Sequence, residues 1–329
     1  MASPSILDRQ LLIVTGNGGV GKSPVAAAIA LLAQQNGKRV LAVELDAKGN
    51  LAESFAGAGG ASQAPHVGYT PTELLPRLSV MAMDAEASLR EYLKINLRLP
   101  FVTKVSALSA AFDFLANAAP GVREIVTIGK VAYEVRERHY DLVVVDASAT
   151  GHVIGLLRAP QAINDLVGVG LIQGQTRWIL DILHDPARTG VIAVTTPEEI
   201  PVNETIDLQQ RLRRETDVEI ASFVVNRVLP PLFDDERDLA RFAQLTGKPS
   251  SLNKFFESKE DHAIAGLLRS AQLSIALNEQ QDRQLDHLLD RIDPFDGPIA
   301  YVPQLFDVTT GLRVTRQVAD VLSDEWNSA

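Results

Sequence analysis

A ten-residue stretch near the amino terminus, TGNGGVGKSP at residues 15–24, limits the folds open to this chain more than any other feature. It follows the apolar run QLLIVT (10–15), and the apolar residues after it recur at helical spacing, so it connects a strand to a helix. Two patterns fit its letters. GNGGVG (16–21) fits the G-x-G-x-x-G turn of dinucleotide-binding folds, and GNGGVGKS (16–23) fits the G-x-x-x-x-G-K-S loop that binds nucleotide phosphates.

Lys22 and Ser23 favour the phosphate-binding loop, because a dinucleotide site has no use for a lysine at that position. In such a loop the backbone N–H groups surround a phosphate, the lysine neutralises the β- and γ-phosphates, and the hydroxyl binds Mg²⁺. The dinucleotide interpretation stays open, since Glu44 follows the glycines at about the spacing of an acid that holds a ribose. We expect ATP or ADP with Mg²⁺ as the ligand, in contact with Gly16, Asn17, Gly18, Gly19, Val20, Gly21, Lys22, Ser23 and Pro24.

Short apolar runs bounded by turn residues recur along the chain, and several are apolar at successive positions rather than alternating. That pattern is typical of strands covered on both faces, as in a parallel sheet. Helical patterns lie between the runs, which predicts an α/β fold with a doubly wound, mostly parallel sheet and helices on both faces. The predicted strands are QLLIVT (10–15), RVLAVEL (39–45), LSVMAM (78–83), DLVVVD (141–146), GVIAVT (190–195), IASFVV (220–225) and PIAYV (298–302).

The organisation of the chain is that of one unit. We find no convincing domain boundary and treat residues 1–329 as a single domain. Residues 85–138 are longer than one crossover needs and are mostly helical in pattern, which predicts an inserted helical subdomain. An apolar series runs through it from Leu93 to Leu115. This series either packs on the sheet or forms a groove for a hydrophobic client or partner protein.

Composition excludes several classes of site. The chain has no cysteine, which excludes disulfides, thiolate zinc sites and thiol redox chemistry. Its net charge is −10 and we find no block of Lys or Arg, so we expect no nucleic-acid partner. No apolar run approaches the ~20 residues that a membrane span needs, and the first ten residues lack the layout of a signal peptide. We therefore expect a cytoplasmic protein.

A second acidic residue, at the end of an apolar strand, is expected beside a phosphate-binding loop because it holds the magnesium shell. Asp146 ends the run DLVVVD (141–146) and is the candidate. An acid at the end of a strand can also cap a turn, but the neighbouring loop favours the metal role.

Several segments, taken together with GGVGK, resemble the arsenite-pump (ArsA) and tail-anchored-protein-targeting ATPase family. LDAKGNLAESF (45–55) and DASATGHVIGLLRAP (146–160) are similar to the first and second switch segments of that family. TTPEEIPVNETIDL (195–208) is close to the family pattern. VVNRVLP (224–230) is similar to the strand end that contacts adenine, and VPQLFDVTTGL (302–312) resembles the loop that closes over it.

The resemblance implies a dimeric ATPase with Mg²⁺ at the nucleotide. In that family the aspartate of the first switch orients the attacking water. The residues implied for the site are the catalytic Asp46 and Lys22, the metal-binding Ser23, Asp46 and Asp146, partly through water, and the base-contacting Asn226 and Pro303.

The chain departs from the family pattern at positions that concern turnover. The family's loop carries a lysine that reaches across the dimer to the partner's nucleotide, and Asn17 stands at that position. Pro24 stands where Ser or Thr is usual, and it lacks the N–H that normally points at the α-phosphate. Proline is tolerated in the first turn of a helix, so we expect the fold to survive. In the first switch, Asp-Ala-Lys-Gly (46–49) replaces Asp-Pro-Ala-His.

Three functions therefore stay open. The first is a Mg²⁺-dependent ATPase that drives a conformational change in a dimer that handles a partner protein. The second is a nucleotide-binding subunit with impaired hydrolysis, in a homodimer or in a heterodimer with a lysine-bearing paralogue. In such a heterodimer the partner would serve this chain's nucleotide, while the partner's site would face Asn17. The third is a dinucleotide enzyme.

Overall fold

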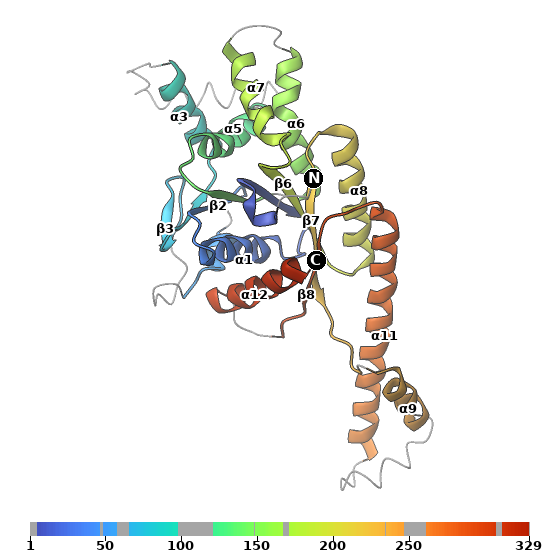
Figure 1. Ribbon diagram of the computed structural model, residues 1–329. Coiled ribbons are helices and arrows are strands. Elements are labelled where there is room, and N and C mark those ends of the chain that lie inside the picture. The colour runs from blue at the N-terminus through green and yellow to red at the C-terminus, as the bar shows by residue number, and fades with distance from the viewer. Residues whose placement is uncertain are drawn as a thin grey trace.

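The computed structural model of the chain describes residues 5–46, 49–57, 66–97, 121–147, 149–166, 171–233, 235–246, 261–306 and 311–328. Within these residues the centre of the fold is an eight-stranded sheet with the order β3-β4-β2-β5-β1-β6-β7-β8 (Figure 1). Adjacent strands pair in parallel, except for β3 and β4, which are antiparallel. The strands are β1 (Leu11–Gly16), β2 (Val40–Glu44), β3 (Thr72–Leu75), β4 (Leu78–Ala82), β5 (Leu142–Asp146), β6 (Thr189–Thr195), β7 (Ile220–Val228) and β8 (Ile299–Pro303).

All seven predicted strands are present, and β3 is the strand that the sequence pattern did not predict. β3 is short, lies at the edge of the sheet and carries only half-buried or exposed side chains. Its pairing with β4 is interrupted between Glu73 and Leu75. An edge strand of this kind lacks the continuous apolar run by which the central strands are recognised.

The sheet is covered on both faces because successive residues of its central strands are apolar. Leu11 and Ile13 of β1 belong to one buried cluster, and Leu12 and Val14 belong to the other. Helices α1 (Lys22–Gln35), α2 (Asn50–Glu53) and α12 (Leu312–Ser328) contribute to the second cluster. The first cluster contains residues of α5 (Val122–Arg136), α6 (Thr150–Leu166), α7 (Leu171–Leu183), α8 (Glu199–Glu215) and the end of α11 (Asp261–Ile292). The predicted fold class is confirmed.

Helices α3 (Ala85–Leu97) and α5 lie in the range predicted for a helical subdomain, 85–138. Residues 98–120, and with them most of the apolar series from Leu93 to Leu115, lie outside the described residues. The subdomain boundaries and the groove therefore stay predictions. On the same side of the sheet, α6 packs against both α5 and α7.

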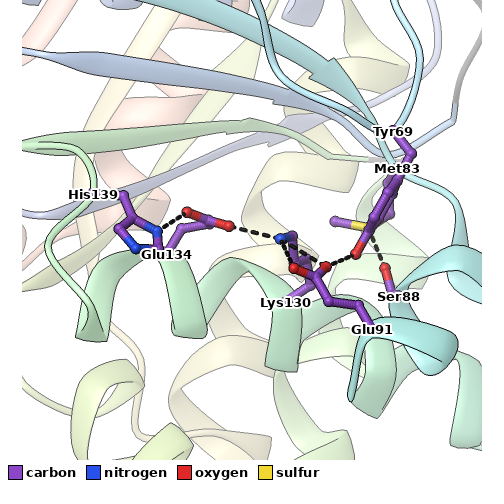
Figure 2. Close-up of polar contacts among 7 residues, drawn as sticks. All are labelled: Tyr69, Met83, Ser88, Glu91, Lys130, Glu134 and His139. Atoms are coloured by element: carbon purple, nitrogen blue, oxygen red, sulfur yellow. Dashed lines mark hydrogen bonds and ion pairs between the residues drawn. The ribbon is translucent and has the colours of Figure 1, made fainter. Parts of the chain in front are cut away.

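An ionic cluster around a buried lysine joins α3 and α5 to the segment that leads into β3 (Figure 2). Lys130 Nζ on α5 lies 2.7 Å from Glu134 and 2.8 Å from Glu91 of α3. Tyr69 donates its hydroxyl to Glu91, and His139 Nδ1 lies 2.7 Å from Glu134. Burial alone would lower the pKa of Lys130, but the two carboxylates reverse that effect and raise it above its usual range. We refer to these five residues as the Lys130 cluster.

A helical arm, formed by α9 (Glu236–Thr246) and the amino-terminal part of α11, extends beyond the sheet (Figure 1). The chain that leads from β7 into the arm is fixed to α11, because Leu229 N donates to Gln281 at 2.9 Å and Asn278 Nδ2 donates to the Leu229 carbonyl at 3.1 Å. The sequence pattern did not predict this arm. Among the described helices, none combines the length and the apolar content that would allow it to cross a membrane.

Candidate nucleotide-binding site

The glycine-rich loop runs from the end of β1 at Gly16 to the start of α1 at Lys22, as the sequence predicts. Two of its glycines are required by close contacts. A Cβ on Gly16 would lie 2.0 Å from the Val194 carbonyl oxygen of β6. Gly21 has a φ of +93°, and a Cβ there would lie 2.3 Å from Asn226 Nδ2. The loop therefore keeps its curved backbone only with glycine at these two positions.

Asn226 is hydrogen-bonded to the loop, although the two are 206 positions apart in the sequence. Its Nδ2 donates to the Val20 carbonyl at 2.8 Å, and its Oδ1 accepts from Arg227 N at 3.0 Å. Val20 itself is buried. The structure thus brings together two predicted site residues from β7 and the loop. It also gives Asn226 a contact with the phosphate loop that the sequence did not predict.

Lys22 and Asn17 close the loop from within. Lys22 Nζ donates to the Asn17 carbonyl at 2.9 Å, and the Asn17 side-chain oxygen accepts from the N–H of Gly18. Gly18 and Gly19 are exposed, so their backbone faces solvent at the tip of the loop. The side chain at the position of the family lysine is therefore neutral and is bonded to its own loop.

Pro24 lies in the first turn of α1 and is exposed. The first hydrogen bond of the helix runs from Val25 N to the Gly21 carbonyl at 3.1 Å. A proline at position 24 therefore removes no bond from the helix, and the expectation that the fold tolerates Pro24 is confirmed.

Asp146 ends β5 beside the loop and is 6% exposed. Burial raises the pKa of its carboxyl group to about 6, and the charges of Glu44 and Asp46 add to that effect. A hydrogen bond from the Ser23 hydroxyl and the charge of Lys22 act in the opposite direction. Three predicted residues, Lys22, Ser23 and Asp46, therefore lie close enough to Asp146 to affect its pKa. They meet at the carboxyl ends of the central strands.

These oxygen donors fit a magnesium ion. A buried carboxylate and a hydroxyl are the ligands that a nucleotide-bound Mg²⁺ takes from a protein, while phosphate and water supply the rest. Within the described residues, no group of three or more acidic or histidine side chains is arranged to hold a metal by itself. The carboxylate of Asp146, which burial destabilises when it is ionised, would be stabilised by a cation.

Glu44 is a residue of this site whose role the sequence did not predict. It ends β2, is 4% exposed and lies opposite Asp146 in the pairing of β2 with β5. Its two carboxylate oxygens accept from Gly49 N at 3.0 Å and from Asn50 N at 2.9 Å. With both oxygens bound to the first switch, Glu44 is not disposed to hold a ribose, which disfavours the dinucleotide interpretation.

The remaining predicted residues lie at the edges of this site. Asp46 is exposed, and the next two positions, 47 and 48, lie outside the described residues. Pro303 is exposed at the end of β8, where the adjacent Val302 pairs with Asn226. Gln304 N donates to the Val228 carbonyl at 2.8 Å, which continues the pairing past the strand. Pro303 and Asn226 therefore lie on neighbouring strands at the same end of the sheet.

Known proteins are similar to this chain over much of its length. A family model described as "Anion-transporting ATPase" matches residues 9–176 and 169–245. The "ATPase BagA" of Mycobacterium tuberculosis is 30% identical over 246 residues, which are 71% of this chain and 69% of that protein. An "ATPase ASNA1 homolog" of Cryptosporidium parvum is 23% identical over 349 residues and 92% of each chain. An "ATPase ASNA1 homolog 1" of Paramecium tetraurelia is 26% identical over 273 residues, covering 70% of this chain and 79% of its own.

Proposed function

The chain belongs to the anion-transporting ATPase family, and from this membership we propose that it is a Mg²⁺-dependent ATPase that converts ATP and water to ADP and phosphate. The observation that carries the proposal is the meeting of Ser23 and Asp146 behind a loop closed by Lys22. A hydroxyl and a buried carboxylate beside an ordered phosphate loop are what ATP hydrolysis needs and what a dinucleotide site does not use.

Each residue has a task in this reaction. The backbone N–H groups of the loop would bind phosphate oxygens, and Lys22 would neutralise charge on the β- and γ-phosphates. Ser23 and Asp146 would hold Mg²⁺, which when bound neutralises the charge that develops on the phosphates. Asp46 would orient the attacking water, and Asn226 and Pro303 would line the base.

We also propose that the protein works as a dimer and that hydrolysis changes the shape of the dimer to act on a partner protein. The resemblance of residues 45–55 and 146–160 to switch segments supports this proposal. Thiol ligation of arsenite is excluded as the driven process, because the chain has no cysteine.

A second function is favoured by Asn17. The neutral side chain is bonded to the N–H of Gly18, so it offers no charge to a nucleotide across a dimer. A homodimer would lack this cation at both sites, whereas a paralogue with the lysine would supply it to the nucleotide held by this chain. The alternative is therefore a nucleotide-binding subunit of a heterodimer that hydrolyses slowly by itself.

The test is phosphate release from ATP and Mg²⁺ by the purified chain, alone and with whatever protein co-purifies with it from its host. We expect release above that of Asp46→Asn, and we expect Asp141→Asn, at the opposite end of β5, to match the unaltered protein. Release equal to that of Asp46→Asn in both preparations would overturn the ATPase and leave the binding subunit. Binding of NAD(P)H without binding of ATP would overturn both.

A further inference from the structure

We propose that Glu44 is a positioning residue for ATP hydrolysis, which holds the first switch so that Asp46 stays at the phosphate end of the site. The inference rests on the proposed ATPase function. In this role Glu44 does not contact the nucleotide. It acts through the backbone of the segment that carries Asp46.

The position of Glu44 is fixed by the sheet. It is the last residue of β2, it pairs with Asp146 of β5, and its carbonyl accepts from Met83 N at 2.8 Å. The residue is 4% exposed, so its backbone and its side chain are both enclosed by neighbouring residues. Whatever its carboxylate binds is therefore held relative to Asp146, the proposed metal ligand on the next strand.

The carboxylate binds the start of α2 with both oxygens. Gly49 N and Asn50 N donate to it at 3.0 and 2.9 Å, and these are among the backbone donors that a helix leaves unpaired at its amino end. α2 has only four residues, Asn50–Glu53, and a helix this short is not stable by itself. A charge-assisted pair of bonds at its positive end supplies the missing stabilisation.

This arrangement places Asp46 between the two parts of the chain that Glu44 joins. Glu44 stands two residues before Asp46, and the N–H groups that Glu44 binds belong to residues three and four positions after Asp46. The carboxylate therefore fixes the chain on both sides of Asp46 within a few residues.

The other end of the segment is held by the last helix of the chain. Thr315 Oγ1 donates to the Ser54 carbonyl at 2.6 Å, and Leu312 N donates to the Ala56 carbonyl at 2.9 Å. Phe55 between them is fully buried. The first switch is thus fixed at one end beside the metal site and at the other end to α12.

The place of Glu44 in the chain distinguishes it from an ordinary cap. The usual capping side chains, those of serine, threonine, asparagine and aspartate, belong to the residue directly before the helix. Glu44 instead reaches α2 from the end of β2, so its two charge-assisted hydrogen bonds also link the helix to the sheet.

The test compares the unaltered protein with Glu44→Gln. This variant keeps the length of the side chain and one acceptor oxygen, and it removes the charge. We expect the kcat for phosphate release to fall about tenfold or more, the loss that a broken charge-assisted hydrogen bond gives. We expect the dissociation constant of a non-hydrolysable ATP analogue to change less than about threefold, since the phosphate loop is untouched. Asp141→Asn serves as the charge-removing control.

Hydrogen exchange supplies a second readout, and one part of it is measured on the unaltered protein. The amide protons of Gly49 and Asn50 should exchange slowly in the unaltered protein and at least about tenfold faster in Glu44→Gln. Rapid exchange of these amides in the unaltered protein would overturn the inference, even if the variant does not fold. A kcat that is unchanged in the variant would overturn it alone, whereas an unaltered protein that releases no phosphate would overturn it together with the ATPase proposal.

Discussion

Asn226 Nδ2 donates a hydrogen bond to the carbonyl of Val20 at 2.8 Å, so a residue expected to contact the base also supports the loop expected to hold the phosphates. The two residues are 206 positions apart in the chain. The base end and the phosphate end of the site are therefore not independent.

The Asn226→Ala variant tests this relationship. It leaves the buried Val20 carbonyl without its donor, a loss of about 1–3 kcal/mol, or roughly 5- to 150-fold in affinity. We expect calorimetry to show weaker binding of ATP and also of tripolyphosphate, which has no base. Tripolyphosphate binding equal to that of the unaltered protein would mean that Asn226 acts on the base alone.

Asn17→Lys should raise the rate of phosphate release by the isolated protein. A cation aimed at the transferring phosphoryl group is worth on the order of 10³-fold or more in related reactions. The Asn17→Gln variant, longer but neutral, is the control and should not raise the rate. No increase with lysine would show that Asn17 does not limit hydrolysis.

Pro24→Ser should strengthen ATP binding without a matching gain in stability. The substitution supplies an N–H near the α-phosphate, worth about 1.5–3 kcal/mol when the acceptor is charged. Because α1 begins its hydrogen bonds at Val25 N, thermal unfolding without nucleotide should change little. A rise in melting temperature with no change in ATP affinity would contradict this account.

The buried carboxyl group of Asp146 predicts how stability depends on pH. Its pKa is raised from 3.8 to about 6, so the folded protein holds this proton more tightly than the unfolded chain. The contribution of this group to the unfolding free energy of the nucleotide-free protein should therefore fall by about 2.5 kcal/mol as the pH rises from about 4 to about 7.5. Binding of Mg²⁺, which requires the ionised carboxylate, should strengthen over the same range.

Urea unfolding of Asp146→Asn measures this contribution, because other carboxyl groups affect both proteins alike. The difference in unfolding free energy between the variant and the unaltered protein should change by about 2.5 kcal/mol between these pH values. Asp141→Asn, which removes an exposed carboxyl group from the other end of β5, should show no such change. A constant difference for Asp146→Asn would refute the assignment.

Lys130→Met should destabilise the protein by about 3–5 kcal/mol, because it leaves the buried carboxylate of Glu134 without the lysine that neutralises it. The Lys130 side chain is 9% exposed and that of Glu134 is 7% exposed. Arg39→Met breaks the exposed pair with Asp141 and should cost no more than about 1 kcal/mol. Similar losses in chemical denaturation for the two variants would show that burial does not distinguish these ion pairs.

The sheet was predictable because its central strands are buried on both faces, which leaves a run of apolar residues in the sequence. The phosphate loop was predictable because its glycines recur at fixed spacing, and a side chain at Gly16 would collide with the Val194 carbonyl. β3 has neither property and was missed.

The roles of Glu44 and Asn226 were not predictable for a different reason. Both bind backbone groups. Every residue except proline carries the same N–H and carbonyl, so the sequence does not show which of these groups a side chain will bind. Glu44 binds the N–H groups of Gly49 and Asn50, and only the folded backbone shows that these two groups point toward its carboxylate. A strand-end acid followed after five residues by a glycine is a weak signal that could have indicated such an anchor.

The attachment of α12 to the first switch bears on how the protein can be shortened. The family model matches residues up to 245, and β8 and α12 follow that point. A fragment trimmed to the matched region would lose Pro303, leave the Ser54 and Ala56 carbonyls without their donors, and bare the apolar side of α1 that α12 covers. The smallest working unit of the protein must therefore retain its carboxyl-terminal helix, which lies outside the region that the family model matches.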